Sequence, residues 1–430
     1  MEDSNILERM RSDWNQRAGE DAYYFVAFGR RGQDDDEFFS TARDVVHGFE
    51  MELKRLRARD AALEIGCGPG RLMRPLAHYF GEIHGVDVSD EMVRLASERL
   101  AGVPNATVHH GDGRGLGMFP DEKFDFVYSY AVFQHIPSRE VVFNYLREAR
   151  RVLKTGGVLR CQLNGLPPHA RQYDTWSGVR VSPEEIAVFA REEDFQLLAM
   201  EQIWTQYMWI TCRKQPRGWR SLPAAPPAPC AIRNLTNALT GEAVTPARGA
   251  LAALSLWVWN LPPDSDPLNT RVLADRRECR LAYIGEPEKD CITQVNAALP
   301  EGIRTGLVPV ALLRGERPLC EPAWVRVIPS GPGVPRITTV SDGINLLSGN
   351  RIATRSVKVT MHEVERAADF QASVDGLPAL EIDSFCADPV GLRYEFNFNL
   401  PHSIGPGMHE VEVRLGKRVF APLPIEVARP

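Results

Sequence analysis

A glycine-rich segment between residues 63 and 71 constrains the fold of this chain more than any other stretch. It reads Leu63-Glu64-Ile65-Gly66-Cys67-Gly68-Pro69-Gly70-Arg71 and joins an apolar run to a helical pattern. Glycines at every second position let the backbone turn tightly and let a ligand approach it closely. The start of the following helix offers free N–H groups and a positive dipole end. The segment therefore predicts a strand-to-helix turn suited to a nucleotide-like ligand or a carboxylate.

Strand-like and helix-like patterns alternate through the first half of the chain. The expected strands cover residues 61–67, 82–88, 106–112, 124–130 and 158–164, and the expected helices cover 71–80, 89–100 and 138–153. Such alternation with right-handed crossovers predicts a parallel, doubly wound sheet. Two further strand-like runs, 196–203 and 207–214, predict a hairpin that closes this sheet with an antiparallel edge.

The spacing of the glycines separates the possible kinds of nucleotide loop. A phosphate-binding P-loop needs Gly-Lys-Ser/Thr, which this segment lacks. The dinucleotide fingerprint Gly-x-Gly-x-x-Gly also fails, because Gly70 comes one residue early. Glu64-x-Gly66-x-Gly68-x-Gly70 is instead the pattern of class I S-adenosylmethionine-dependent methyltransferases of the type 11-like group, which this region resembles.

Further segments carry the resemblance in the right order. Asp87 ends the second expected strand, Asp112-Gly113 ends the third, and residues 124–137 run from the fourth strand into Gln134-His135. The match is close over residues 58–165 and holds in layout over 1–213. The resemblance implies a Rossmann-like, seven-stranded α/β sheet that binds S-adenosylmethionine and releases S-adenosylhomocysteine. The cofactor contacts that it implies are Glu64, Gly66, Cys67, Gly68, Gly70, Asp87, Val88, Met92, Asp112, Gly113, Ser129 and Tyr130.

Each of these positions also has a purely structural interpretation. The glycines could serve only the turn, Asp87 could cap the following helix, and Asp112 could be a turn residue. Met92 fits the core of its helix as well as it fits an adenine face. A carboxylate at Asp87 can accept from both hydroxyls of a ribose, which favours the binding interpretation.

Two residues are candidates for a direct part in methyl transfer. His135 follows the fourth strand at the carboxyl edge of the sheet, where a base would meet the acceptor. Its structural alternative is a helix-start residue bonded to backbone. Tyr24 belongs to an aromatic N-terminal segment that we expect to form a helical lid over residues 1–57, and it could donate a hydrogen bond to the acceptor. Residues 169–176 should line the pocket from the other side.

The second half of the chain has a different composition. Residues 214–229 are rich in proline and predict a semi-rigid linker. Short alternating segments follow, and the stretch 296–306 is echoed at 397–407 with an offset of 101 residues. This spacing predicts two copies of an all-β sandwich, at 230–330 and 335–430. Residues 249–262, 283–285 and 299–300 resemble the bacterial immunoglobulin-like domains called IPT or TIG, which bind protein or carbohydrate or act as spacers.

The composition narrows the partners and the setting. The chain has 430 residues and a net charge of −6, which argues against a nucleic-acid-binding face spread over the protein. The acidic N-terminus lacks the features of a signal peptide, and no stretch is long and apolar enough to span a membrane. The eight cysteines show no zinc spacing. We therefore expect a cytoplasmic protein without a metal site.

Two functions remain open at this stage. The first is an active methyltransferase whose tail docks a protein, glycan or polymer partner, with a small molecule or a glycan favoured as acceptor. The second is a binding or scaffold protein whose methyltransferase-like domain is inactive. The intact motif residues favour the first. The sequence selects neither the acceptor nor an oxygen, nitrogen or carbon atom for methylation.

Overall fold

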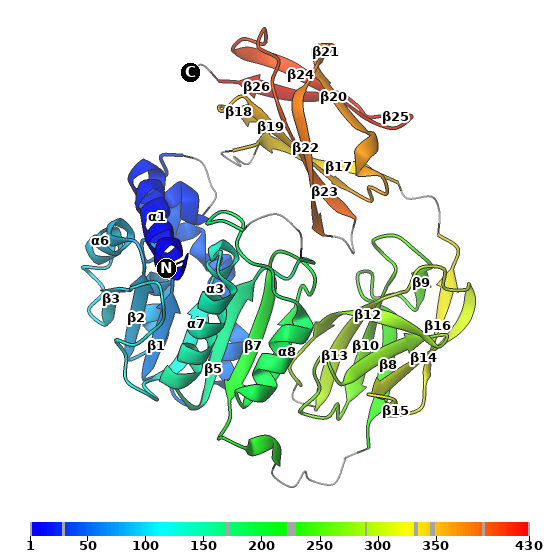
Figure 1. Ribbon diagram of the computed structural model, residues 1–430. Helices are drawn as coiled ribbons and strands as arrows, with labels where there is room; N and C mark the ends of the chain where they lie inside the picture. The colour runs from blue at the N-terminus through cyan, green and yellow to red at the C-terminus, as the bar shows by residue number, and fades with distance from the viewer. Residues whose placement is uncertain are drawn as a thin grey trace.

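The structure of the protein is a computed structural model. It describes residues 2–27, 31–168, 173–221, 229–288, 290–330, 334–344, 349–388 and 392–428. Figure 1 shows a helix-flanked sheet in the N-terminal half and two bodies built of strands in the C-terminal half. The predicted α/β half followed by a mostly β half is confirmed. Among the described helices, none is both long enough and apolar enough to cross a membrane.

In the described residues before the first strand there are four helices. They are α1 (Glu2–Ala27), α2 (Asp35–Ser40), α3 (Ala42–His47) and α4 (Glu50–Arg55). Helix α1 lies against the helix that follows the second strand (Figure 1). The amide oxygen Oδ1 of Asn15 accepts a hydrogen bond from Ser89 Oγ at 2.6 Å, and Arg11 forms a 2.7 Å ion pair with Asp90. These contacts hold the N-terminal segment over one edge of the sheet.

The N-terminal half contributes its strands to the sheet in the order β3-β2-β1-β4-β5-β7-β6. The first five are parallel, and β7 and β6 run antiparallel. Their bounds are β1 (Ala61–Ile65), β2 (Glu82–Asp87), β3 (Ala106–His110), β4 (Phe124–Ser129), β5 (Leu153–Leu163), β6 (Phe195–Glu201) and β7 (Met208–Lys214). The helices between them are α5 (Met73–Leu76), α6 (Asp90–Arg99), α7 (Arg139–Val152) and α8 (Pro183–Glu192).

Helix boundaries follow the capping chemistry. Ser89 Oγ accepts from Met92 N–H at 3.1 Å and Ser138 Oγ from Val141 N–H at 3.3 Å, so α6 and α7 begin where the sequence predicts. The helix expected over 71–80 is shorter, because the glycine turn takes up its first residues and a 3-10 helix, Ala77–Tyr79, replaces its end. Helix α8 was not predicted, although Ser182 and Glu185 form a capping box at its start.

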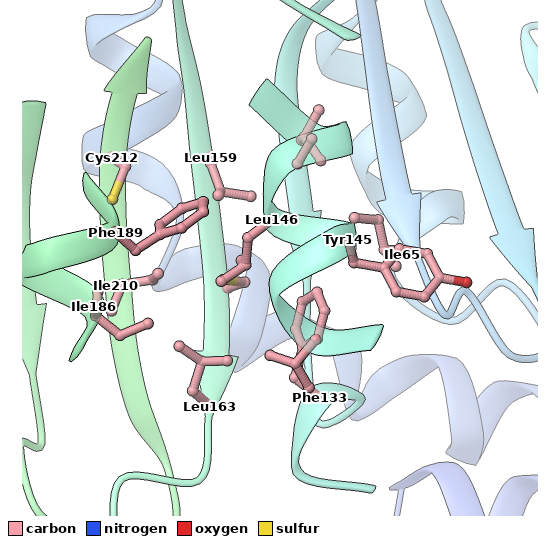
Figure 2. Packing of buried hydrophobic residues seen from close by; sticks show 14 of the residues in the cluster. Ile65, Phe133, Tyr145, Leu146, Leu159, Leu163, Ile186, Phe189, Ile210 and Cys212 are labelled. Carbon is pink, nitrogen blue, oxygen red and sulfur yellow. The ribbon is translucent and has the colours of Figure 1, made fainter. Parts of the chain in front are cut away.

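The core of this half lies on both faces of the sheet. Every residue of β1 and β4 is buried, as expected for central strands covered by helices on both sides. Figure 2 shows Leu146 of α7 and Phe189 of α8 packed toward Leu159 of β5 and Ile210 of β7. The apolar faces of the helices therefore pack against the sheet and hold its strands, and with them the strand ends, in place.

The predicted antiparallel hairpin is confirmed by β6 and β7, but the prediction that it closes the sheet is wrong. Strand β6 does not end the sheet, because Met200 pairs with Ile284 of β12 (Arg277–Ile284) from the C-terminal half. The backbone N–H of Ile203 also donates to the carbonyl of Ala282 at 3.2 Å. The edge of a sheet presents unpaired N–H and C=O groups that can pair with another strand. Here β12 of the same chain pairs with β6, although β6 has a register shift between Leu197 and Ala199.

The C-terminal half repeats one set of strand pairings. In the first copy β8-β10-β13 form one layer and β11-β14-β16-β9 the other, and β12 pairs with both β13 and β11. The remaining bounds are β8 (Ala231–Asn237), β9 (Val244–Pro246), β10 (Ala253–Trp259), β11 (Thr270–Ala274), β13 (Ile292–Ala298), β14 (Gly306–Arg314), β15 (Arg317–Pro318) and β16 (Ala323–Ile328).

The second copy separates into two sheets, β17-β19-β23-β22 and β18-β26-β24-β20-β21. Strands β14 and β24 begin 101 residues apart, as do β13 and β23, so the echo in the sequence marks equivalent strands. The bounds are β17 (Arg336–Asp342), β18 (Arg351–Ile352), β19 (Ser356–His362), β20 (Phe370–Val374), β21 (Leu377–Pro378), β22 (Leu380–Asp388), β23 (Arg393–Asn399), β24 (Gly407–Leu415), β25 (Arg418–Val419) and β26 (Leu423–Val427).

Candidate active site

A pocket of about 920 Å³, counted out to its open mouth, lies at the carboxyl ends of β1, β2 and β4. Ligands bind at this edge of open α/β sheets. Where the connections after two neighbouring strands run to opposite faces of the sheet, the loops leave a crevice between them. Helix α1 forms the outer wall. The lining residues are Met10, Trp14, Phe25, Val26, Glu64, Ile65, Gly66, Cys67, Gly68, Arg71, Leu72, Val86, Asp87, Val88, Met92, Tyr130, Ala131, Val132, His135, Ile136 and Tyr145.

The glycine turn forms the floor of the pocket. Gly66, Gly68 and Gly70 have φ angles of +71°, +50° and +84°, a region that other residues rarely adopt. A Cβ on Gly66 would lie 2.4 Å from a methyl of Val132, and one on Gly70 would lie 2.8 Å from Leu100. The turn thus needs glycine both for its backbone angles and for the close approach of its neighbours.

Asp87 joins the glycine turn to the start of α6. Its Oδ2 accepts from Gly68 N–H and its Oδ1 from Ser89 N–H, both at 2.9 Å. Burial raises the pKa of this carboxyl, while the backbone N–H bonds oppose the rise. Each oxygen uses one acceptor site on the backbone and keeps another for a ligand. The carboxylate is therefore held rigidly at the pocket wall and can accept from two hydroxyls.

Glu64 lies at the end of β1 and is almost completely buried. Tyr128 donates its hydroxyl to Glu64 Oε2 at 2.9 Å. Burial, which disfavours the charged form, raises the pKa of Glu64 to about 8. The carboxyl therefore carries a proton at neutral pH and can donate a hydrogen bond as well as accept one.

Asp112 has a different environment from Asp87 in the structure. Asp112 is exposed, its Oδ1 accepts from Arg114 N–H at 2.8 Å, and it does not line the pocket. Gly113 beside it is buried, with a φ of +78°, close to Val88 and Leu7. These two positions lie behind the pocket wall formed by Val88.

The other predicted contacts gather around the pocket. Cys67, Val88, Met92 and Tyr130 line it, whereas Ser129 is buried and donates its hydroxyl to the carbonyl of Ile65 at 2.8 Å. Met92 also packs in a small cluster beneath α1, so its two interpretations are compatible.

His135 lines the pocket at the end of the 3-10 helix Phe133–His135. Its Nδ1 lies 3.0 Å from the carbonyl oxygen of Trp176, which places the ring proton on Nδ1. Nε2 is then the acceptor of the ring, and the side-chain amide nitrogen of Gln134 lies 3.4 Å from it. Burial lowers the pKa of His135 to about 4. The ring is therefore neutral at pH 7, and it is a hydrogen-bond acceptor but a weak base.

The aromatic N-terminal segment closes the pocket. Trp14 meets the His135 ring edge-on with centroids 5.4 Å apart. The Arg17 guanidinium lies 4.7 Å from the ring of Trp14 and 5.4 Å from that of Trp176, and its Nη1 donates to the carbonyl of Thr175 at 3.0 Å. This stack fastens α1 to the loop after β5, opposite the glycine turn.

Tyr24 is buried in this segment but does not line the pocket. Its ring lies 4.6 Å from the Arg31 guanidinium, and burial raises its pKa to about 12. Its neighbours Phe25 and Val26 reach the pocket instead. Of the loop expected to line the pocket, residues 169–172 lie outside the described residues. In the described remainder, Trp176 packs against His135 without lining the pocket.

Sequence reasoning missed Arg71 as a site residue. It follows the last glycine of the turn, lines the pocket and has only 4% of its surface exposed. A single basic residue next to a ligand-binding glycine turn was the available signal, but surface arginines are too common for it to be informative alone.

Comparison with known proteins identifies the domain around this pocket. Residues 63–161 match the family described as a methyltransferase domain. The chain is 35% identical over 131 residues to trans-aconitate 2-methyltransferase of Afipia carboxidovorans, which is 30% of this chain and 46% of that protein. It is 36% identical over 105 residues to phosphoethanolamine N-methyltransferase 2 of Caenorhabditis elegans, covering 24% and 23%.

Among solved structures, phosphoethanolamine N-methyltransferase 1 of Haemonchus contortus, with phosphoethanolamine and S-adenosylhomocysteine bound, matches with a TM-score of 0.38. Its sequence identity is 16%, over 50% of each chain. The chain spans less than half the length of the two curated relatives. The matched segment contains the glycine turn, Asp87, Ser129, Tyr130 and His135. Residues 63–161 therefore form a methyltransferase domain, and its cofactor is S-adenosylmethionine.

Proposed function

We propose that the protein transfers a methyl group from S-adenosylmethionine to an acceptor that enters the pocket beneath α1. The rigid Asp87 carboxylate beside the glycine turn is the observation that carries this proposal. It has two free acceptor sites at the place where a parallel sheet binds nucleosides. The turn also fits the cofactor, because a Cβ at Gly66 or Gly68 would fill space at the pocket floor.

We assign Asp87 to the ribose hydroxyls, and Val88 and Met92 to the apolar faces of the adenine. Both apolar residues line the pocket next to Asp87. Asp112 is assigned to the adenine amino group only through the resemblance, and this role requires its exposed carboxylate to turn toward Val88. The amino-acid end of the cofactor then lies toward Glu64 and Tyr130.

When bound, S-adenosylmethionine supplies an electrophilic methyl group on its sulfonium. The work of the chain is to hold the acceptor in line with that methyl group and to exclude water. Trp14 and Phe25 of α1 cover the pocket, and Arg17 holds Trp14 against the loop after β5. His135 Nε2 accepts a hydrogen bond from the methyl acceptor, in place of the Gln134 amide that lies 3.4 Å away, and so orients it. Because its pKa is low, His135 acts as a positioning residue and not as a general base that takes up the proton.

The acceptor that fits this pocket is a small molecule or a small glycan group. The pocket is enclosed by apolar and aromatic side chains, with few polar groups to orient a ligand. The relatives named above act on trans-aconitate and phosphoethanolamine, both small and charged. We propose that the strands after residue 230 form two immunoglobulin-like, IPT/TIG-like sandwiches that bind a partner or deliver the acceptor.

A binding or scaffold protein with an inactive domain is the competing function, and cofactor binding decides between the two. The full chain should bind S-adenosylhomocysteine in a calorimetric titration, and Asp87→Ala should weaken binding at least about tenfold, since it removes a charged acceptor of two hydrogen bonds. Asp60→Ala is the control, because Asp60 is exposed and pairs with Lys154. Wild-type protein without binding at millimolar ligand would contradict the enzyme function.

A second experiment identifies the acceptor. Cell extract is incubated with labelled S-adenosylmethionine and either the wild-type chain or Asp87→Ala. A labelled product that depends on Asp87 identifies the acceptor and shows which atom receives the methyl group.

A further inference from the structure

Arg71 is a buried cation that lacks the partners a buried cation normally has. Its Nη1 donates to the hydroxyl and carbonyl oxygens of Thr41 at 3.1 and 3.3 Å, and its guanidinium lies 5.1 Å from the Tyr130 ring centroid. Its Nε is buried without a hydrogen-bond partner. Among the residues that the structure describes, no carboxylate lies within ion-pair distance of Arg71.

Two other arginines of the same half show the usual arrangement. Arg160, 5% exposed, pairs with Glu52 at 2.8 Å and Glu201 at 3.0 Å, although its Nε, like that of Arg71, has no hydrogen-bond partner. Arg150, 6% exposed, donates to two backbone carbonyls. Removing a guanidinium from water costs several kcal/mol unless its donors and its charge are matched. Arg71 is equally buried but lacks the carboxylate partners of Arg160, and it differs from both other arginines in lining the pocket.

The acidic residue that interacts electrostatically with Arg71 is held mainly in its protonated form. Glu64 lines the same pocket, but burial raises its pKa to about 8, so it is neutral at pH 7. Asp87 is the other acidic lining residue and is engaged by Gly68 and Ser89. His135 is the other basic one and is neutral. The part of the pocket beside Tyr130 therefore offers one uncompensated positive charge.

We propose that Arg71 is the anion-binding residue of this pocket and that its ligand is a carboxylate. A planar guanidinium matches a carboxylate in shape, and one cation balances one such anion. A phosphate dianion would need a second cation, and Arg71 is the one charged cation among the described lining residues. The carboxylate comes from the amino-acid end of the cofactor or from the acceptor. The inference rests on the proposed function, because both sources belong to a methyl-transfer site.

The test uses ligands that differ by a single group. S-Adenosylhomocysteine and S-adenosyl-3-thiopropylamine, which lacks only the carboxylate, are titrated into the full chain, Arg71→Met and Arg71→Lys. If the cofactor supplies the carboxylate, Arg71→Met weakens S-adenosylhomocysteine binding at least about tenfold and changes the decarboxylated ligand less than about twofold. Arg71→Lys keeps the charge and should fall between the two.

A second titration addresses the acceptor. Protein saturated with S-adenosylhomocysteine is titrated with benzoate and with its neutral analogue benzamide, probes that fit the aromatic lining. Binding of benzoate alone, lost in Arg71→Met while S-adenosylhomocysteine affinity is unchanged, assigns the carboxylate to the acceptor.

The matched control is Arg74→Met. Arg74 lies on the same helical turn but is exposed, 4.7 Å from the Phe39 ring, and does not line the pocket. The proposal is overturned if Arg71→Met loses the same affinity for both cofactor ligands. It is also overturned if Arg71→Met loses affinity for neither ligand and benzoate binding does not depend on Arg71. Should Arg71→Met fail to fold, judged by its melting curve, Arg71→Lys and Arg71→Gln carry the same comparison. Wild-type protein that binds neither cofactor ligand contradicts the proposed function instead.

Discussion

Single residues at the strand ends decide what the pocket can do, and similar positions in the sequence have different environments. Asp87 and Asp112 both follow strands, yet Asp87 is fixed by two backbone N–H groups while Asp112 is exposed. The sequence could place both near the edge of the sheet. It could not show which carboxylate faces the pocket, because that depends on how the chain turns after each strand.

Glu64 provides a test of the electrostatics at this scale. Its pKa rises from an ordinary 4.5 to about 8 in the folded protein. The folded state therefore holds a proton that the unfolded state releases between these values. The stabilisation that this proton gives is complete below pH 4.5 and is lost as the pH rises toward 8.

Glu64→Gln removes this ionisation. The free energy of unfolding of Glu64→Gln relative to wild type should therefore increase with pH between about 5 and 8. The slope should approach about 1.4 kcal/mol per pH unit. Urea unfolding of both proteins at several pH values measures it, and Glu98→Gln on the exposed face of α6 is the control. Parallel pH curves for wild type and Glu64→Gln would show that Glu64 is ionised in the fold.

At the scale of elements, the glycine turn is the most predictable part of the molecule. The sequence predicts its place between a strand and a helix, and the structure adds Val132 and Leu100 as the side chains that press on it. These contacts come from residues 30 or more positions away, so local sequence could not predict them. The length of α5 was missed for a related reason, since the turn and a 3-10 helix compete with the α-helical pattern.

Gly66→Ala tests the turn. The new Cβ needs a strained φ of +71° and would lie 2.4 Å from Val132. We expect a loss of about 1–3 kcal/mol in unfolding free energy and weaker S-adenosylhomocysteine binding. Gly102→Ala is the control, because a Cβ there meets nothing within 4 Å. Adding Val132→Ala to Gly66→Ala should restore only the part of the unfolding free energy that the clash with Val132 removes. A Gly66→Ala protein with unchanged unfolding free energy would refute the packing argument.

At the scale of the whole molecule, the first copy of the β repeat is joined to the methyltransferase sheet. Besides the β6–β12 pairing, Arg191 of α8 makes two hydrogen bonds to the buried carboxylate of Asp266, at 2.7 and 2.8 Å. Arg280 also lies 4.2 Å from the ring of Trp204. The sequence predicts a linker at 214–229 but gives no sign of these contacts, because they join residues about 75 positions apart.

Arg191→Met tests this junction. It leaves the Asp266 carboxylate buried without its cation, and since Arg191 is about one-third exposed we expect a loss of about 1–2 kcal/mol. Calorimetric unfolding of the full chain should show residues 31–221 and 229–330 melting together in the wild type and separating in the variant. Arg304→Met, which breaks the more exposed pair with Asp275, is the control. Two separate transitions in the wild type would contradict a joint unit.

The sequence by itself determined the elements and the kind of site. Hydrophobic period, glycine spacing and the serine caps are local, so they predict the α/β half, the cofactor turn and the repeated β strands. Only the tertiary structure decided which polar groups face the pocket, that Arg71 is buried there with few partners, and that β6 continues into β12. These features depend on burial and on contacts between residues far apart in the chain. A side chain's solvation and charge are set by the neighbours that folding brings to it.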